Sequence, residues 1–186
     1  NLKKKEAFIS GKYSFNNKDF LKYDLNSNNL NKNQNLIMNF EYMNLIDLKF
    51  INYQKPETKV SDISINLTKN KDIVKIKEIK CVENKNSFLV KDIRFKKNNF
   101  SSFKEILVKT YFKGEKNNDF SIKFGKKIII SGSHIDATNF SKFFNQNPTK
   151  NNFSNLSKKI EIDFENIKAP LSKNLNNFKL IGFIDK

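Results

Sequence analysis

The sequence contains very few of the residues that build metal and redox sites. Cys81 is the only cysteine and His134 the only histidine among 186 residues. A single cysteine cannot form an intrachain disulfide, and a structural zinc site needs about four Cys or His ligands. Cys81 stands in the apolar-patterned stretch 76–82, where we expect it to be a small core residue. We therefore predict no metal and no cofactor.

Long hydrophobic runs are also lacking. No stretch approaches the roughly 20 consecutive apolar residues of a membrane-spanning helix, and no signal peptide is recognisable. Five glycines and three prolines are too few for a collagen-like or low-complexity chain. The sequence starts at Asn1 without a methionine and reaches Lys186 while still patterned as a strand. We expect residues 1–186 to be a single β-rich segment cut from a longer chain.

Arginine is nearly absent, although the chain is strongly basic. Lysine and arginine total 35 against 19 acidic residues, which gives a net charge of +16, and Arg94 is the only arginine. Recognition of phosphates and guanine edges favours the bidentate arginine side chain. The lysines are spread along the whole chain, which is typical of a charge that maintains solubility and attracts anionic surfaces such as lipid headgroups. No specific nucleic acid is expected as a partner.

Bulky apolar residues are abundant, 19 of them Phe, and they recur in a repeated pattern. Each copy has two apolar residues three positions apart and a third apolar residue two positions later. The copies start at Leu45, Val60, Ile76, Val90, Phe103 and Leu175. By subtraction, the first five start 15, 16, 14 and 13 residues apart, a spacing typical of a strand plus a turn.

The last three positions of each copy alternate as a half-buried strand does. The three-residue step before them breaks this alternation, and a bulge or bend at the third position would restore the facing. A small polar or acidic residue, which tolerates such a bend, occupies that position: Asp47, Asp62, Glu78, Asp92, Glu105 and Asn177. Breaks at 83–86, 96–99 and 115–118 are turn signals. The pattern predicts a mainly β antiparallel meander with one apolar face.

Further strands are expected elsewhere in the chain, at residues 6–15, 36–42, 106–112, 126–131 and 158–167. In the last of these, the apolar residues Ile160, Ile162 and Phe164 should point to one side, and three acidic residues to the other. We expect the acidic side to be solvated, so it does not indicate a general acid–base pair.

Residues 136–157 interrupt the strand pattern. Three phenylalanines stand there at helical spacing: Phe140, Phe143 and Phe144. Asp136 is placed to cap a short helix at about 137–145, and a polar loop should follow it to residue 157. Ser133, His134 and Asp136 could belong to a hydrolase triad, but no Gly-x-Ser-x-Gly elbow is present. We do not expect an enzyme.

A resemblance to a known family lies in this half of the chain. The strand, Gly-x-x-Ile-Asp-Ala turn and helix at 128–144, the strand at 158–167 and the stretch 175–182 resemble the AsmA-like superfamily, and within it the large YhdP-type proteins. The resemblance is best over about residues 60–186. It implies an inner-membrane-anchored protein whose periplasmic part is an elongated, curled sheet. The concave side of such a sheet is an apolar groove that carries phospholipids between the two membranes of Gram-negative bacteria.

One short helix, about 14 Å long, could cover only a few strands of such a meander. An apolar face that the protein cannot cover itself is a candidate ligand surface. We expect seven residues of the repeat to line a groove for phospholipid acyl chains: Ile63, Ile65, Ile79, Ile93, Phe95, Ile106 and Val108. The alternative is that these residues fill the closed core of a sandwich or barrel, in a structural or surface interaction domain.

Overall fold

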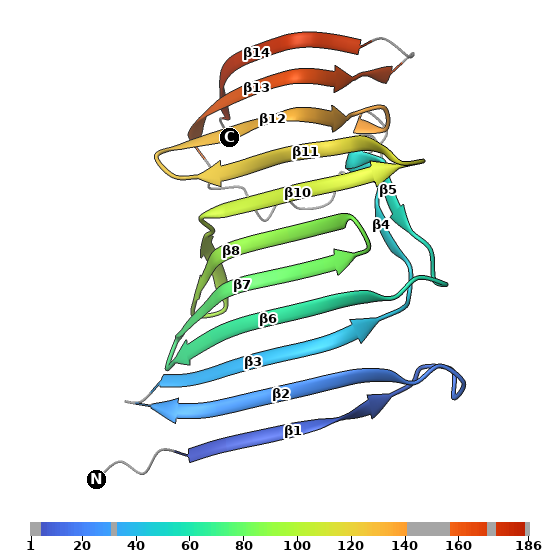
Figure 1. Ribbon diagram of the computed structural model, residues 1–186. Coiled ribbons are helices and arrows are strands. Elements are labelled where there is room, and N and C mark those ends of the chain that lie inside the picture. The colour runs from blue at the N-terminus through green and yellow to red at the C-terminus, as the bar shows by residue number, and fades with distance from the viewer. Residues whose placement is uncertain (1–4, 31–32, 141–156, 171–173, 185–186) are drawn as a thin grey trace. The chain divides into compact units, whose positions relative to one another are not determined.

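The computed structural model describes residues 5–30, 33–140, 157–170 and 174–184 (Figure 1). These residues are mostly in β-strands, which confirms the mainly β prediction. The chain forms two compact units. The first consists of Asn1–Asn44 and Pro56–Ile106, and the second of Leu45–Lys55 and Leu107–Lys186.

The first unit contains one antiparallel sheet. Its strands, in hydrogen-bonded order, are β1 (Lys5–Tyr13), β2 (Leu21–Leu30), β3 (Asn33–Tyr42), β6 (Ser61–Asn70), β7 (Ile73–Glu83), β8 (Asn86–Lys96) and β9 (Asn99–Ser102). Each strand pairs antiparallel with the next in this order. The predicted breaks at 83–86 and 96–99 are tight turns, in which Asn84, Lys97 and Asn98 have positive φ. The meander prediction is confirmed for this unit.

The second unit contains a small two-stranded sheet and a mixed sheet. The small sheet pairs β4 (Ile46–Leu48) with β5 (Tyr53–Lys55), and the 3-10 helix η1 (Lys49–Ile51) joins them. The other strands are β10 (Glu105–Phe112), which starts at the boundary of the units, β11 (Glu115–Phe124), β12 (Lys127–Asp136), β13 (Lys158–Lys168) and β14 (Asn174–Ile184).

The antiparallel prediction is wrong at one place in the second unit. Strand β13 runs parallel to β12, whereas β11 is antiparallel to β12 and β14 is antiparallel to β13. Parallel pairing requires a crossover of about a dozen residues or more, and the connection from Asp136 to Lys158 is long enough for one. The repeat pattern carries no information on strand direction, because the same apolar alternation suits parallel and antiparallel pairing.

Three copies of the repeat have the predicted irregularity. Strand β7 has an extra residue, Lys77, directly before Glu78, and Ile76 therefore lies opposite Leu67 while Ile79 lies opposite Ile65. Asp92 in β8 and Asn177 in β14 have φ of 55° and 52°, in the left-handed region. These bends allow apolar residues three positions apart to face the same side of a sheet.

The other three copies do not form bulged strands. Leu45, Val60 and Phe103 lie outside the strands, so their copies have no three-residue step to correct. The predicted break at 115–118 is also wrong, because the turn lies at Lys113–Gly114 and β11 already includes Asn118.

Asp136 ends β12 and accepts a backbone hydrogen bond at the start of the segment where the helix is predicted. The Thr138 backbone N–H donates to Asp136 Oδ1 at 3.1 Å, and the Phe140 N–H donates to the Ala137 carbonyl at 3.0 Å. Most of the predicted helix at 137–145 and of the polar loop to 157 lies outside the described residues.

Candidate functional site

Apolar side chains of the first unit gather on one face of its sheet, here called the apolar face. Directly opposite residues of paired strands project to the same side. Three successive rows across β2, β3, β6, β7 and β8 follow from the register: Tyr23, Phe40, Ile63, Cys81 and Phe88; then Leu25, Met38, Ile65, Ile79 and Val90; then Ser27, Leu36, Leu67, Ile76 and Ile93. All but Ser27 are apolar.

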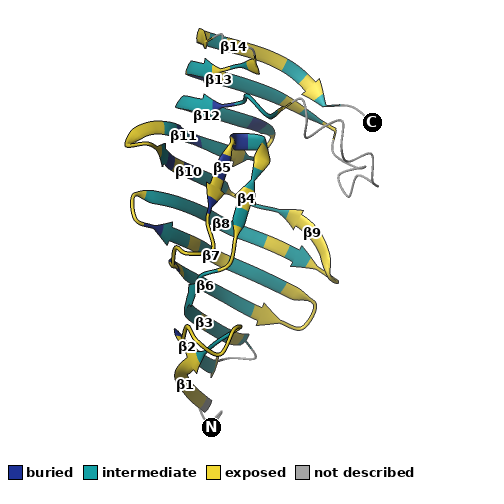
Figure 2. Cartoon of the chain, turned by 90° about the vertical axis from the view of Figure 1, so that its right-hand side faces the viewer, coloured by how far each residue is buried: buried dark blue, intermediate teal, exposed yellow. Residues whose placement is uncertain are grey.

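Five of the seven predicted groove residues lie on or beside this face. Ile63, Ile65, Ile79 and Ile93 belong to the three rows, and Phe95 lies in the next row, opposite Val74. These five side chains are half-buried, and Figure 2 shows the same intermediate exposure over much of strands β6 to β8. The structure therefore brings the five together.

The remaining two predicted residues, Ile106 and Val108, lie in β10. Val108 belongs to the second unit, and only 6% of it is exposed. It is a core residue there.

The prediction missed most of the apolar face. Its β2 and β3 members, among them Leu25 and Met38, were not among the expected groove residues, and Ile93 is the only β8 member of the three rows that was. Part of the signal was present, because Leu36, Met38 and Phe40 alternate along the expected strand 36–42. Strand β2 gave little signal, since its second half is rich in Asn and Ser.

The opposite face of the same sheet is polar. Asn39 Nδ2 donates to Asp24 Oδ1 at 2.8 Å, and Thr68 Oγ1 donates to Asn35 Oδ1 at 2.8 Å. A third polar contact joins Asp92, at the bend of β8, to Lys75 of β7.

That contact is the ion pair between Lys75 Nζ and Asp92 Oδ1, at 2.8 Å. The hydrogen bond from Lys75 is the main cause that lowers the pKa of Asp92 below its usual value, against a smaller opposing effect of burial. The first sheet is thus amphipathic, with hydrogen-bonded polar pairs on one side and apolar rows on the other.

A hollow of about 1070 Å³ opens on the polar face. Charged residues of both signs line it, among them Lys22, Lys80, Glu41 and Asp62. Ile63 is the one predicted groove residue in its lining. The hollow is thus lined mainly by residues of the polar face, and it also reaches Tyr23, Phe40 and Ile63 of the first apolar row.

The sheet of the second unit also has an apolar face, on which Phe120, Ile128 and Phe164 are buried. On the same face, Ile130, Ile160 and Ile162 are half-buried. Ile128 and Ile130 of β12 lie opposite Ile160 and Ile162 of β13, which confirms the predicted facing of β13. The rings of Phe120 and Phe164 meet edge to face with centroids 6.0 Å apart, and these residues are 5% and 2% exposed.

Gly132 lies between these two phenylalanines in the register. A Cβ at this position would lie 2.2 Å from the Asp119 carbonyl oxygen, so only glycine fits beside the bulge. The apolar face of the second unit is thus a tightly packed core at this point.

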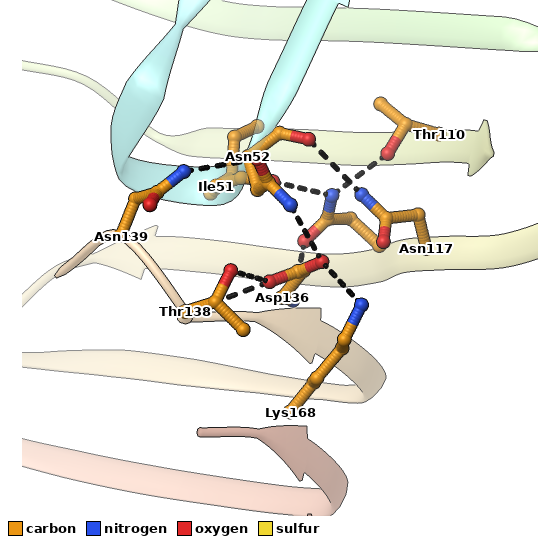
Figure 3. A network of polar contacts seen from close by, with 9 residues as sticks. Ile51, Asn52, Thr110, Asn117, Asp136, Thr138, Asn139 and Lys168 are labelled. Atoms are coloured by element: carbon orange, nitrogen blue, oxygen red, sulfur yellow. Dashed lines mark hydrogen bonds and ion pairs between the residues drawn. The ribbon is translucent and has the colours of Figure 1, made fainter. Parts of the chain in front are cut away.

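A buried polar network fixes the segment Leu45–Lys55 to the second unit (Figure 3). Asn118, fully buried in β11, donates through Nδ2 to the Ile51 carbonyl at 2.9 Å and to Thr110 Oγ1 at 2.8 Å. Its Oδ1 accepts the backbone N–H of Asp136 at 2.9 Å. Asn52 donates through Nδ2 to Asp136 Oδ2 at 3.0 Å. Sequence reasoning missed this network, because its members are far apart in the chain.

The structure does not arrange Ser133, His134 and Asp136 as a catalytic triad. Ser133 Oγ lies 3.1 Å from His134 Nδ1, but the Asp136 carboxylate accepts hydrogen bonds from Thr138, Asn52 and Lys168. These contacts are those of a structural carboxylate. Among the described residues, no three His, Cys, Asp or Glu side chains converge on a position for a metal ion.

Within the described ranges, no helix has the length and apolar character needed to cross a bilayer. Comparison of the chain with protein-family models, with curated proteins and with solved structures found no match.

Proposed function

We propose that this chain is a non-enzymatic lipid-binding segment, and that the apolar face of its first unit holds phospholipid acyl chains. One observation carries the proposal: three consecutive apolar rows cross five strands on one face of a sheet and stay half-buried. Contiguous apolar surface of this kind is unfavourable in water and marks binding sites for apolar ligands.

The resemblance to the AsmA-like, YhdP-type proteins supports the same role. By this proposal, the chain is a periplasmic part of an inner-membrane-anchored envelope protein that transports phospholipid, and its partner is lipid rather than nucleic acid. The apolar face then supplies the hydrophobic wall of the route, as a curled sheet with an apolar concave side would.

The direct experiment is native mass spectrometry of the purified protein together with binding of a fluorescent phospholipid. We expect co-purified phospholipid with the wild type. Ile65→Asp places a carboxylate in the middle of the apolar rows and should weaken binding at least about tenfold, since burying an unpaired charge is costly.

Ser64→Asp is the matched control, because the neighbouring residue of the same strand faces the polar side. It should leave lipid binding unchanged. Circular dichroism would establish that both variants fold. A lipid-free wild type that takes up no fluorescent lipid would contradict the proposal.

A second function, a structural or interaction β-domain with a closed core, is favoured by one feature of the second unit. Phe120, Ile128 and Phe164 are at most 7% exposed, as in an ordinary protein core. In that case the protein would bind no lipid, and its partner would be another protein.

A further inference from the structure

One end of the apolar face carries a different set of side chains from the rest. The row that follows Ser27, Leu36 and Leu67 has Asn29, Gln34 and Lys69 on strands β2, β3 and β6, and it continues with Val74 and Phe95 on β7 and β8. The side chains of Asn29, Gln34 and Lys69 are exposed. The first unit therefore presents amides and a cation directly beside its last apolar row.

A hollow of about 270 Å³ lies at this end of the sheet. Its lining consists of Asn29, Asn33, Gln34, Lys69 and Lys71. As far as the structure describes the chain, its lining has two ammonium groups, three amide side chains and no carboxylate. Among the described residues, neither lysine forms an ion pair with an acidic side chain. Ammonium and amide N–H groups are the donors that bind phosphate oxygens.

The opposite end of the face carries a carboxylate that is already paired with a lysine. Glu83 follows Cys81 by two residues on β7, so it lies on the same side of the sheet beyond the first apolar row. It is 8% exposed, and its carboxylate is 3.6 Å from Lys59 Nζ. An anion is therefore favoured at the Lys69 end, where the lysines have no acidic partner among the described residues, over the Glu83 end, where the lysine is already paired.

The length of the apolar rows matches a lipid. From Ile63 to Leu67 along β6 the chain rises about 14 Å, at about 3.4 Å per residue. The acyl chains of one leaflet occupy about 15 Å, half of the roughly 30 Å hydrocarbon core. A phospholipid whose acyl chains lie along the strands on the three rows thus has its phosphate at the level of Lys69.

We propose that Asn29, Gln34, Lys69 and Lys71 form a site for the phosphate of a phospholipid headgroup, and that they orient the bound lipid along the strands. This inference rests on the proposed function, because it assumes that acyl chains occupy the apolar face. It adds the chemical class of the headgroup contact and the direction of the bound molecule.

The experiment compares a short-chain phosphatidylglycerol with the diacylglycerol that has the same acyl chains and no phosphate. The wild type should bind phosphatidylglycerol about tenfold more tightly, as expected for charge-assisted contacts. The double variant K69Q/K71Q should bind both lipids equally, with its affinity for diacylglycerol unchanged. The double variant K12Q/K80Q removes the same charge from lysines that line the polar-face hollow, and it should keep the preference.

The outcomes separate the two proposals. Equal binding of both lipids by the wild type, or a preference that survives in K69Q/K71Q, overturns the headgroup site and leaves the acyl-chain face standing. A wild type that binds neither lipid overturns both. Inorganic phosphate is the third probe. If it binds as tightly as phosphatidylglycerol and K69Q/K71Q abolishes this binding, the site takes the free anion and the assignment to a lipid headgroup is overturned.

Discussion

Asp136 shows how one buried carboxylate can organise the polar contacts around it. It is 1% exposed, and its oxygens accept hydrogen bonds from Thr138, Asn52 and Lys168. Burial raises the pKa of Asp136, but the hydrogen bonds from Thr138 and Asn52 and the charge of Lys168 outweigh burial and hold the pKa below its usual value. The folded protein thus favours the charged form of this side chain.

A pH-dependent contribution to stability follows from this shift. Asp136 stabilises the fold fully above the pKa of an unfolded aspartate, about 3.9, and its contribution is lost as the pH falls through the lower folded pKa. Asp136→Asn should lower the free energy of unfolding by about 3 kcal/mol at pH 7, because buried donors lose a charged acceptor. Urea titrations followed by circular dichroism should show the gap to the wild type narrowing as the pH falls below about 4.

Asp163→Asn is the control for this experiment. Asp163 is exposed, and its contact to Lys179 at 3.2 Å is a surface ion pair, so its replacement should change stability by less than about 1 kcal/mol. A gap between wild type and D136N that stays constant at all pH values would contradict the assigned role.

At the scale of elements, the segment with β4, η1 and β5 depends on contacts with the second unit. Residues Leu45–Lys55 lie between β3 and β6 in the chain, yet β3 pairs directly with β6. The segment's own pairing is limited to two three-residue strands, which cannot be stable alone. The contacts from Asn118 and Asp136 therefore supply much of what orders it.

Replacing Asn118 should loosen this segment without unfolding the sheet. Asn118→Ala removes the hydrogen bonds to the Ile51 carbonyl, to Thr110 Oγ1 and from the Asp136 N–H. Leaving these buried groups unpaired costs about 1–3 kcal/mol, so amide hydrogen exchange in 45–55 should accelerate at least about tenfold.

Asn117→Ala is the matched control, since the neighbouring side chain makes only a 3.4 Å contact to the Asn52 carbonyl. It should change exchange in 45–55 little. Unchanged protection of the segment in N118A, or an equal loss of protection in all strands of the second unit, would argue against the docking role.

The strands differ in how well the sequence predicts them. Strands β6, β7 and β8 were predictable because their apolar periodicity, their bends and their Asn-rich turns agree with one another. Residues 115–118 were misread as a turn, because the composition of Glu-Lys-Asn-Asn favours one, whereas tertiary contacts hold Asn118 in a strand. The parallel pairing of β12 with β13 depends on a long connection, and local patterns carry no signal for it.

At the scale of the whole molecule, the two units differ in how far they cover their apolar faces. The rows of the first unit stay half-buried, whereas Phe120, Ile128 and Phe164 of the second unit are at most 7% exposed. The net charge of +16 adds a separate effect, because it attracts any anionic membrane surface without a specific site. A useful experiment must separate adsorption by charge from contact with acyl chains.

Photo-crosslinking with a phospholipid that carries its reactive group in an acyl chain makes this separation. At about 1 M salt the Debye length falls to about 3 Å, which suppresses adsorption by charge while it strengthens the burial of apolar groups. Under these conditions we expect labelled peptides from β3, β6, β7 and β8, since their apolar side chains are accessible. Phe120, Ile128 and Phe164 should be labelled far less, because they are at most 7% exposed. Labelling concentrated in the second unit, or labelling that disappears with added salt, would show that lipid does not bind through the apolar face.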